Sequence, residues 1–482
     1  MPFLQTCIPQ EEYVCADDHY RSEEIAMSDH SAKAAGNNKM GSMPVPNLLL
    51  NMSIPLMLSL LCQSLYNIVD SIFVSRISES ALTATSLAYP VQMLMMAGAV
   101  GTGVGVSSLL SRLVGSKKYD DANICATTGL TLSVCTSLIF VVLSFFFVEF
   151  WVGMYTSDPE TAEMCETYLH IVMLFCTGTY LETLAQRLLQ AVGNTFLSMI
   201  SLICGALTNI ILDPILIFGL LGNPAMGIRG AAIATVIGQW VGAIVALLLN
   251  YFRNREIHFV FRGYRFNTKM AAGIYKVGVP TMVMQAMGSV MTSCMNAILI
   301  SFSSTAVAFF GVYFKLQSFL FMPMNGLGQA VLPIVGFNYG SRNKDRLQQV
   351  LKIALPAAII IALVGTLIFN LLPTQLLGLF SASDEMLALG VPALRIISVT
   401  FALSSSTMIL GYYASGLGNG VINMLGTVLR QFAVLIPMVY LLAQVGGINY
   451  VWYAFWVSES VALIAAALLF IRTYRAKLSE IR

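Results

Sequence analysis

The feature that most constrains this chain is a series of apolar runs, each long enough to cross a lipid bilayer as a helix. About 20 mostly apolar residues are needed for one crossing. Only 10% of the 482 residues are charged and 57% are hydrophobic, whereas soluble domains carry about 25% charged residues. We therefore predict an all-α polytopic membrane protein with twelve transmembrane helices, at 46–76, 84–110, 127–149, 166–190, 196–220, 230–252, 273–301, 307–335, 350–372, 389–413, 422–443 and 449–471.

Lysine and arginine residues are concentrated in alternate loops, and Arg229 is the exception among the loops between them. Because cytoplasmic loops carry the excess of these residues, both termini are predicted to lie in the cytoplasm. The basic residues follow the second, sixth, eighth and twelfth runs: Arg112, Lys117, Lys118, Arg253, Arg255, Arg262, Arg265, Lys269, Lys276, Arg342, Lys344, Arg346, Lys352, Arg472, Arg475, Lys477 and Arg482.

Residues 1–42 are polar and contain no apolar segment of the kind found in signal peptides. We interpret them as a disordered cytoplasmic tail, and the whole chain as a protein of the plasma membrane, which here would be a bacterial inner membrane. The net charge of +2 does not indicate a nucleic-acid partner. The nine cysteines form no CxxC pair, so neither a metal site nor a cofactor is predicted from them.

The two halves of the chain repeat each other at one constant offset, the offset that places Pro55 on Pro280. The repeat predicts an N-terminal six-helix lobe at 43–252, a basic linker at 253–272, a C-terminal lobe at 273–471 and a tail at 472–482. Such parallel repeats are typical of transporters that bind substrate between the lobes. Other matched pairs are Met57 and Met282, Gln92 and Gln317, Gly101 and Gly326, Gly103 and Gly328, Gly115 and Gly340, and Gly193 and Gly418.

One acidic residue, Asp70, lies inside the first apolar run. A charged residue at the middle of a membrane helix costs about 2.5–3.5 kcal/mol. Gln63, Asn67, Asp70 and Ser71 share one helix face, which must face protein or water. The face is either a hydrogen-bonded cluster that joins helices or an ion site, and an acid inside a membrane is functional by default.

A second polar group, Asn209 and Asp213, lies in the sequence TNIILDPIL of the fifth run. The spacing of four places both side chains on one helix face. Pro214 has no N–H group and is predicted to kink the helix, which frees the carbonyl of Ile210. The alternatives are a kink capped by polar side chains and a set of oxygen ligands for an ion.

Four further polar residues lie in or near apolar runs. Glu182 is predicted to pair with Gln186 or Arg187 in a structural role. Glu459 is a lone acid in the last run, with structural and functional roles left open. Lys315 either senses substrate or reaches toward the membrane surface, and Arg395 is assigned the surface role.

The repeat places Met295 where the first half has Asp70. Methionines recur around this position at helical spacing: Met284, Met287, Met291 and Met295. Flexible methionine side chains suit surfaces that bind varied ligands, although core packing is the more frequent reason for such a stripe. We treat this stripe, together with Gln63 and Lys315, as candidate substrate-binding residues.

Several segments together resemble the multidrug and toxic compound extrusion (MATE) family: VSRLVGSKKYDDAN, LDPILIFG, GIRGAAIATVIGQ and MPMNGLGQAVLPIVGFNYGSRN. The resemblance implies twelve helices in two rocking lobes, a central cleft, and export of organic cations in exchange for protons or sodium ions. It also implies an ion site in the N-terminal lobe formed by Asp70, which follows Pro55 in the first run at the spacing that the family shows. Asn209, Asp213 and a threonine, for which Thr235 is the candidate, would complete this site.

Two carboxylates in one low-dielectric pocket cannot easily both stay ionised. One of Asp70 and Asp213 would therefore bind a proton, or a sodium ion would neutralise the pair. The C-terminal runs 273–301 and 389–413 lack the acids that sodium-dependent relatives of this family use, so proton coupling is favoured.

Two other functions compete with export. A lipid-linked oligosaccharide flippase of the same superfamily would need several basic residues in the cleft, and the predicted spans hold few. A membrane-embedded enzyme would need a catalytic constellation, and the sequence contains no G-x-x-x-x-G-K-[ST] phosphate loop. We predict that the chain is not an enzyme.

Overall fold

The structure is a computed structural model that describes residues 38–222, 224–380 and 382–481. In the first half, the helices are α2 (Lys39–Ser42), α3 (Val45–Ser75), α4 (Glu79–Gly115), α5 (Tyr119–Tyr155), α6 (Pro159–Leu174), α7 (Thr177–Ala191), α8 (Thr195–Phe218), η1 (Leu220–Gly222) and α9 (Ile228–Arg253). In the second half, they are α10 (Thr268–Leu299), α11 (Ser304–Gly340), α12 (Lys344–Leu371), α13 (Pro373–Gly378), α14 (Asp384–Ser398), α15 (Phe401–Gly416), α16 (Val421–Val428), η2 (Leu429–Ala433), α17 (Leu435–Gly446), α18 (Ile448–Val451) and α19 (Ala454–Ser479).

The helices account for the predicted membrane spans, with two interruptions. Within the described ranges, ten helical segments are long and apolar enough to cross a membrane, and the pair α14–α15, bent by 46°, is an eleventh if counted as one span. The remaining predicted span, 166–190, corresponds to α6 and α7, which are separated at Phe175 and Cys176. The all-helical polytopic fold predicted from the apolar runs is therefore confirmed.

The repeat seen in the sequence is also present in the backbone. Ser78 caps α4 by accepting from the N–H of Ala81, and its repeat partner Ser303 caps α11 by accepting from Ala306. The turns after these helices match as well, because Lys117 and Arg342 have φ of 59° and 57°. Non-glycine residues rarely adopt this left-handed conformation, so its recurrence at the same offset shows that both halves fold alike.

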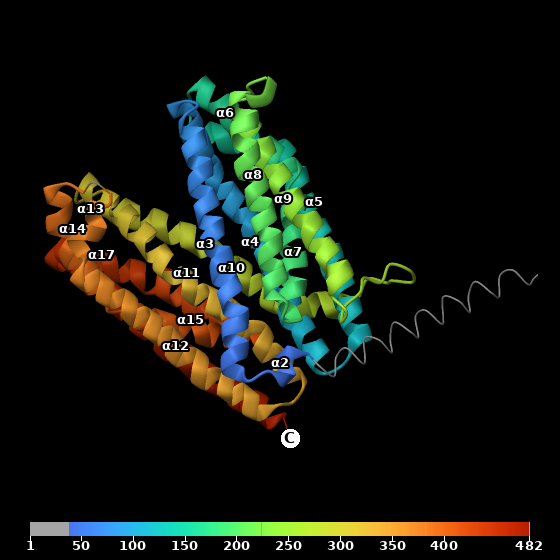
Figure 1. Ribbon diagram of the computed structural model, residues 1–482. Coiled ribbons are helices and arrows are strands. Elements are labelled where there is room, and N and C mark those ends of the chain that lie inside the picture. The colour runs from blue at the N-terminus through green and yellow to red at the C-terminus, as the bar shows by residue number, and fades with distance from the viewer. Residues whose placement is uncertain (1–37, 223, 381, 482) are drawn as a thin grey trace, which may run out of the picture.

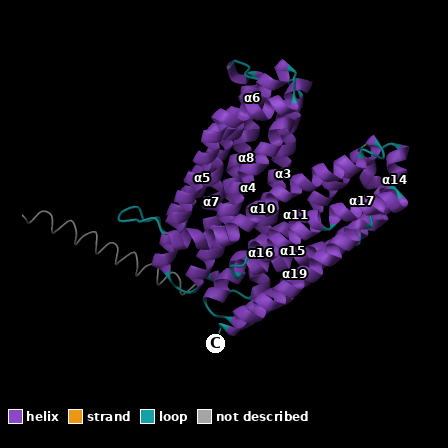
Figure 2. Cartoon of the chain, turned by 180° about the vertical axis from the view of Figure 1, so that it is seen from behind, coloured by secondary structure: helices purple, strands orange, loops and turns teal. Residues whose placement is uncertain are grey.

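The two halves meet at one end of the molecule and diverge toward the other (Figures 1 and 2). Helix α4 packs against α10 and α11, and α3 packs against α11. At the meeting point, a Cβ added to Gly115 would lie 2.0 Å from the carbonyl oxygen of Phe337, and one added to Gly340 would lie 2.0 Å from that of Arg112. These matched glycines let α4 and α11 cross at backbone contact, as small residues do in membrane proteins.

Short helix α2 lies at this same end and contacts both halves of the chain. Asn38 Nδ2 donates to both carboxylate oxygens of Glu256 at 2.8 Å, in the loop after α9. Arg346 Nη2 donates to the carbonyl oxygens of Met40 and Met43 at 2.9 and 2.7 Å, and the Met40 side chain is fully buried. The predicted disordered tail at 1–42 is therefore wrong for residues 38–42, and residues 1–37 lie outside the described residues.

The helices at the other predicted boundaries are longer than expected. Helix α10 begins at Thr268 inside the predicted linker 253–272, where Asn267 caps it by accepting from the N–H groups of Lys269 and Met270. Helix α19 continues to Ser479 through most of the predicted tail 472–482. Hydropathy predicts where a helix leaves the apolar interior of the membrane. The helix itself continues to its capping residues, which can lie beyond that point.

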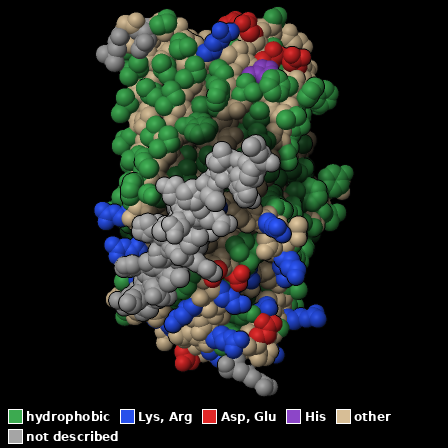
Figure 3. Space-filling view, turned by 90° about the vertical axis from the view of Figure 1, so that its right-hand side faces the viewer, with side chains coloured by type: hydrophobic (Ala, Val, Ile, Leu, Met, Phe, Trp, Pro, Cys, Tyr) green, Lys and Arg blue, Asp and Glu red, His purple; other side chains and the backbone are tan. Residues whose placement is uncertain are grey.

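The surface has the pattern of a membrane protein. Exposed hydrophobic side chains form a broad band between two charged ends, and Lys and Arg gather at the lower end in the view of Figure 3. On α3 the exposed side chains include Leu58, Leu65 and Ile72. We call the end at which the two halves meet, which carries Lys117, Arg342 and Arg346, the basic end.

Candidate functional site

Asn209, Asp213 and Thr235 form a buried polar cluster between α8 and α9. In one orientation, the Asn209 amide nitrogen lies 3.4 Å from both Asp213 Oδ1 and Thr235 Oγ1. In the flipped orientation, its nitrogen donates to Asp213 Oδ2 at 3.3 Å and its oxygen accepts from the backbone N–H of Thr235 at 3.2 Å. Both orientations join the three residues, and the Asp213 side chain is fully buried.

Close packing of α8 against α9 forms this cluster. A Cβ added to Gly238 of α9 would lie 3.0 Å from the Cβ of Asn209, so the glycine lets the asparagine side chain lie against the α9 backbone. Pro214 lies inside α8, which runs without interruption from Thr195 to Phe218. Pro55 likewise lies inside the continuous helix α3, and neither proline ends its helix.

Asp70 lies on α3, which packs against α8. Its Oδ1 atom is buried and has no hydrogen-bond partner among the described residues. The Asp70 carboxylate is within electrostatic reach of Asp213. The Tyr66 hydroxyl is within electrostatic reach of both aspartates and of Glu182. The structure therefore brings the two aspartates that the sequence singled out into one region of the N-terminal lobe. A buried carboxylate oxygen without a partner is unfavourable, so this oxygen is available for a proton or a cation.

A cavity of about 490 Å³ lies between the two lobes. The N-terminal lobe contributes Gln63 and Asn67 from the α3 polar face and Asn209 and Thr235 from the buried cluster. The cluster therefore borders the cavity through Asn209 and Thr235, with Asp213 behind them. The C-terminal lobe contributes Met284, Gln285, Met322, Asn325, Gln329, Tyr412, Ser415 and Asn423.

One face of α7 lines the cavity, and this is the part of the site that sequence reasoning missed. Its lining residues are spaced by three and four along TYLETLAQRLLQ, so the signal was present in the sequence, but the sequence favoured a structural pairing of Glu182 with Gln186 or Arg187. The α7 lining consists of Thr179, Glu182, Thr183, Gln186, Arg187 and Gln190.

The hydrogen bonds of α7 separate Glu182 from Arg187. Gln186 Nε2 donates to Glu182 Oε1 at 3.1 Å, which is one of the two pairings expected for this acid. Arg187 Nη1 instead donates to Gln190 Oε1 at 2.8 Å and to Gln329 Oε1 of α11 at 3.0 Å. A Cβ added to Gly242 would lie 2.4 Å from Glu182 Oε1, so this glycine makes room for the carboxylate.

The methionine stripe does not form a single wall of the cavity. Met284 lines the cavity, but Met291 and Met295 are 6% and 0% exposed and belong to the core of the C-terminal lobe. The expectation that the whole stripe faces substrate is therefore wrong for Met291 and Met295. The reason is that α10 is packed on several sides: it contacts α4, and it also packs against α11, α16 and α17. One stripe along this helix can therefore face both the cavity and the core. Met287 is half-buried and is outside the cavity lining.

The other intramembrane charges lie away from the cavity. Lys315 and Arg395 are exposed and are not among the residues that line it, so the proposed contact of Lys315 with substrate has no support in this arrangement. Glu459 is 5% exposed and lies 3.8 Å from Arg430 Nε inside the C-terminal lobe.

Comparisons with known proteins agree with this architecture. The MatE family model matches twice, at residues 55–215 and 280–441, and the two matches begin at Pro55 and Pro280, which the repeat pairs. The multidrug export protein MepA of Staphylococcus aureus strain MSSA476 is 25% identical over 430 residues, covering 88% of this chain and 93% of the relative. MepA of Staphylococcus haemolyticus is 25% identical over 421 residues, covering 87% and 91%.

Solved structures of transporters share the fold. One, described as an outward-facing conformation of a multidrug resistance MATE family transporter, has a TM-score of 0.84 and 25% identity over 91% of this chain and 98% of that one. A transporter of the MOP superfamily from Pyrococcus furiosus has a TM-score of 0.84 and 24% identity over the same shares.

The prediction that the chain is not an enzyme is confirmed by these matches. Because the two family matches together cover more than half of its length, and its helices form the same two-lobed membrane fold, the chain belongs to the MatE family of multidrug and toxic compound extrusion transporters.

Proposed function

We propose that this protein exports organic cations across a bacterial plasma membrane in exchange for protons. The observation that carries the proposal is that Asp213 lies in a hydrogen-bonded group with Asn209 and Thr235 at the edge of the cavity, on the helix α8 that packs against the α3 helix of Asp70. A pocket of this kind holds a proton more readily than two negative charges. The names of the relatives, multidrug export protein, support a drug as the exported substrate.

The proposed mechanism is alternating access by rocking of the two lobes. By the positive-inside rule the basic end faces the cytoplasm, so both termini are cytoplasmic and the contact between the lobes closes that side. The similar structure that is described as outward-facing supports this assignment. A proton taken up by Asp70 or Asp213 from the outside would neutralise the pocket, and its release on the cytoplasmic side would restore the negative charge that attracts a cation.

Drug binding is assigned to the cavity between the lobes. Glu182 is the acidic residue in the described lining of this cavity, which also contains methionine and amide side chains. An acidic group within a flexible, partly apolar cavity suits large cations of varied shape. Asn67 and Gln63 line this cavity and lie on the same face of α3 as Asp70. The drug site and the proton site would therefore adjoin, so that drug and proton can compete.

The alternatives make different demands on the site. Sodium coupling would place the ion among the oxygen atoms of Asp70, Asn209 and Asp213. A flippase for lipid-linked oligosaccharides would need several basic groups for pyrophosphate, whereas Arg187 is the basic residue in the described cavity lining, and it donates to Gln190 and Gln329.

The test is efflux of a cationic dye from liposomes that contain the purified protein. A pH gradient and a sodium gradient are imposed separately, with empty liposomes as the control. Efflux that follows the pH gradient alone supports proton coupling. Efflux that follows only the sodium gradient would reverse the choice of ion, and no gradient-driven efflux of any cation would remove the proposed function.

A further inference from the structure

An ion pair lies inside the C-terminal lobe, away from the site described above. Glu459 on α19 is 5% exposed, and its Oε1 lies 3.8 Å from Nε of Arg430. This separation is longer than the roughly 2.7–2.9 Å of a charge-assisted hydrogen bond. The second carboxylate oxygen, Oε2, is buried and has no hydrogen-bond partner in the part of the chain that the structure describes. The pair is thus incompletely satisfied, which is costly for a buried charge and calls for an explanation.

Arg430 belongs to a π-helical segment rather than to a regular α-helix. The segment η2 spans Leu429–Ala433 between α16 and α17. π-Helical segments are rare in proteins, and those that occur often lie at functional sites. Their extra residue disturbs the regular ladder of backbone hydrogen bonds. Here the segment also packs against α10, a helix that contributes to the cavity wall.

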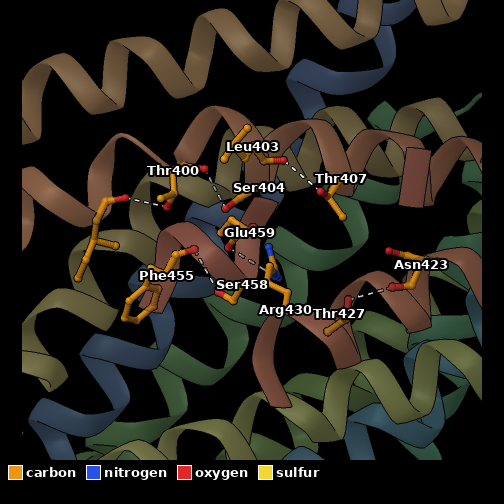
Figure 4. A network of polar contacts seen from close by, with 11 residues as sticks. Thr400, Leu403, Ser404, Thr407, Asn423, Thr427, Arg430, Phe455, Ser458 and Glu459 are labelled. Atoms are coloured by element: carbon orange, nitrogen blue, oxygen red, sulfur yellow. Dashed lines mark hydrogen bonds and ion pairs between the residues drawn. The ribbon is translucent and has the colours of Figure 1, made fainter. Parts of the chain in front are cut away.

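A polar face runs along α16 from Arg430 of this ion pair to Asn423 (Figure 4). Asn423 lines the cavity, Thr427 lies one turn further along α16 and donates to the Asn423 carbonyl at 3.0 Å, and Arg430 follows at the next turn. Opposite lies α15, where the side chains of Ser404, Thr407 and Thr400, which immediately precedes the helix, carry hydroxyl groups. Polar side chains therefore lie at successive turns between the cavity-lining Asn423 and the pair of Arg430 and Glu459.

Few charged or titratable groups face Glu459 from the helices around it. Arg430 faces it from η2. The Tyr313 hydroxyl on α11 is within electrostatic reach of Glu459 and is buried with no hydrogen-bond partner in the described segments. From α15 the neighbouring side chain is the Ser404 hydroxyl. Helices α16 and α17 contain no charged residue.

We propose that Glu459 is a second proton-binding group of the transporter, located in the C-terminal lobe and reached from the cavity along Asn423, Thr427 and Arg430. In one state the ionised carboxylate pairs with Arg430. In the other, the pair opens, Glu459 Oε2 holds a proton, and the guanidinium of Arg430 turns toward the polar face. The inference rests on the proposed proton coupling, and it adds a site in the lobe to which no ion had been assigned.

The experiment counts the protons that drug binding releases. Purified protein in weak buffer with a pH-sensitive dye receives a saturating amount of the cation tetraphenylphosphonium. If drug and proton binding are mutually exclusive, each weakens the other. Glu459→Gln should therefore lower the number of protons released per drug bound by about one relative to the wild type. Ser458→Ala, an adjacent buried residue whose hydroxyl bonds to the Phe455 carbonyl, is the matched control and should release the wild-type number.

A purely structural role for the ion pair is tested with the double variant. Glu459→Gln alone leaves Arg430 without its charged partner, so the variant loses stability in either case. Arg430→Gln combined with Glu459→Gln removes both charges and should recover the melting temperature. If Glu459 binds a proton, the double variant still releases about one proton fewer than the wild type. If it releases the wild-type number at full drug occupancy, the inference is wrong.

Two further outcomes separate this inference from the proposed function. If the wild type binds the drug but releases no protons, both proposals fail together. If wild-type efflux follows the pH gradient and Glu459→Gln leaves proton release unchanged, only the second site fails. Thr427→Val should slow proton release without changing the number of protons, because it removes a hydroxyl from the proposed path and leaves the acid in place.

Discussion

Arg187 of α7 and Gln329 of α11 are joined by a hydrogen bond of 3.0 Å that connects the two lobes across the cavity. Both side chains line the cavity, and under the proposed rocking mechanism the two helices would have to separate, which would break this bond. A hydrogen bond to a charged group stabilises by about 1.5–3 kcal/mol. This contact therefore contributes to keeping the basic end closed.

The first prediction concerns this inter-lobe bond. Gln329→Ala should raise the population of molecules with separated lobes at the basic end by about tenfold or more. Spin labels at the exposed, repeat-related residues Asp120 and Asp345 would report the separation as a distance distribution. Gln285→Ala, which changes another glutamine of the cavity, is the matched control. Equal distributions in wild type and Gln329→Ala would show that the bond does not hold the lobes together.

The second prediction concerns Glu256, which lies in the loop after α9. Burial raises the pKa of Glu256 from 4.5 to about 7, and the hydrogen bonds from Asn38 lower it by a smaller amount. The folded protein therefore binds this proton more tightly than the unfolded chain. The stabilisation is fully present below about pH 4.3, the value for an unfolded glutamate, and is lost as the pH rises through 7.

The measurement for Glu256 is thermal unfolding of the purified protein between pH 5 and pH 8. The wild type should lose several degrees of melting temperature over this range, and Glu256→Gln should lose less. The glutamine still offers an oxygen to Asn38, so the hydrogen bond is kept while the titration is removed. Parallel pH profiles for the two proteins would contradict the assignment.

The third prediction separates two methionines of one helix. Met284 lines the cavity, whereas Met295 is fully buried in the C-terminal core. Met284→Ala should change the relative efflux of large and small dyes, with effects of up to about 1–3 kcal/mol for the larger ones. Met295→Ala should lower stability by about 2–5 kcal/mol and reduce efflux of all dyes alike. If the two variants behave in the opposite way in a panel of dyes, the assignment of Met284 to the cavity and Met295 to the core is wrong.

The general architecture could be predicted from the sequence because each part left a periodic signal. The constant offset between the halves recurs in the paired caps Ser78 and Ser303 and in the paired left-handed residues Lys117 and Arg342. The spacing of Asn209 and Asp213 placed them on one face, and the structure joins Asn209 by a hydrogen bond to Thr235, the threonine that the family resemblance suggested.

Other features could not be predicted, for physical reasons. A methionine in a membrane helix is equally compatible with lipid, core and cavity, because all three surroundings are largely apolar. The periodicity of Met284 and Met295 could therefore not show that only one of them lines the cavity. The break between α6 and α7 falls at Phe175 and Cys176, which are not residues that typically interrupt a helix. The burial of α2 depends on residues far away in sequence, such as Glu256 and Arg346.

The last prediction concerns Asp70 and Asp213, the central claim of this account. If the two carboxyl groups share one pocket and act as a unit, removing either one should remove coupling, and removing both should add little. Asp70→Asn, Asp213→Asn and the double variant should each lose dye efflux driven by a pH gradient. Each should retain exchange of labelled for unlabelled dye, which requires drug binding and lobe movement but no net proton transfer.

The most direct test is to measure both activities on the same liposomes for the wild type and these three variants. The account predicts gradient-driven efflux only in the wild type, with dye exchange in all four proteins. Asp70→Asn or Asp213→Asn with near wild-type gradient-driven efflux, or partial losses that multiply in the double variant, would contradict it.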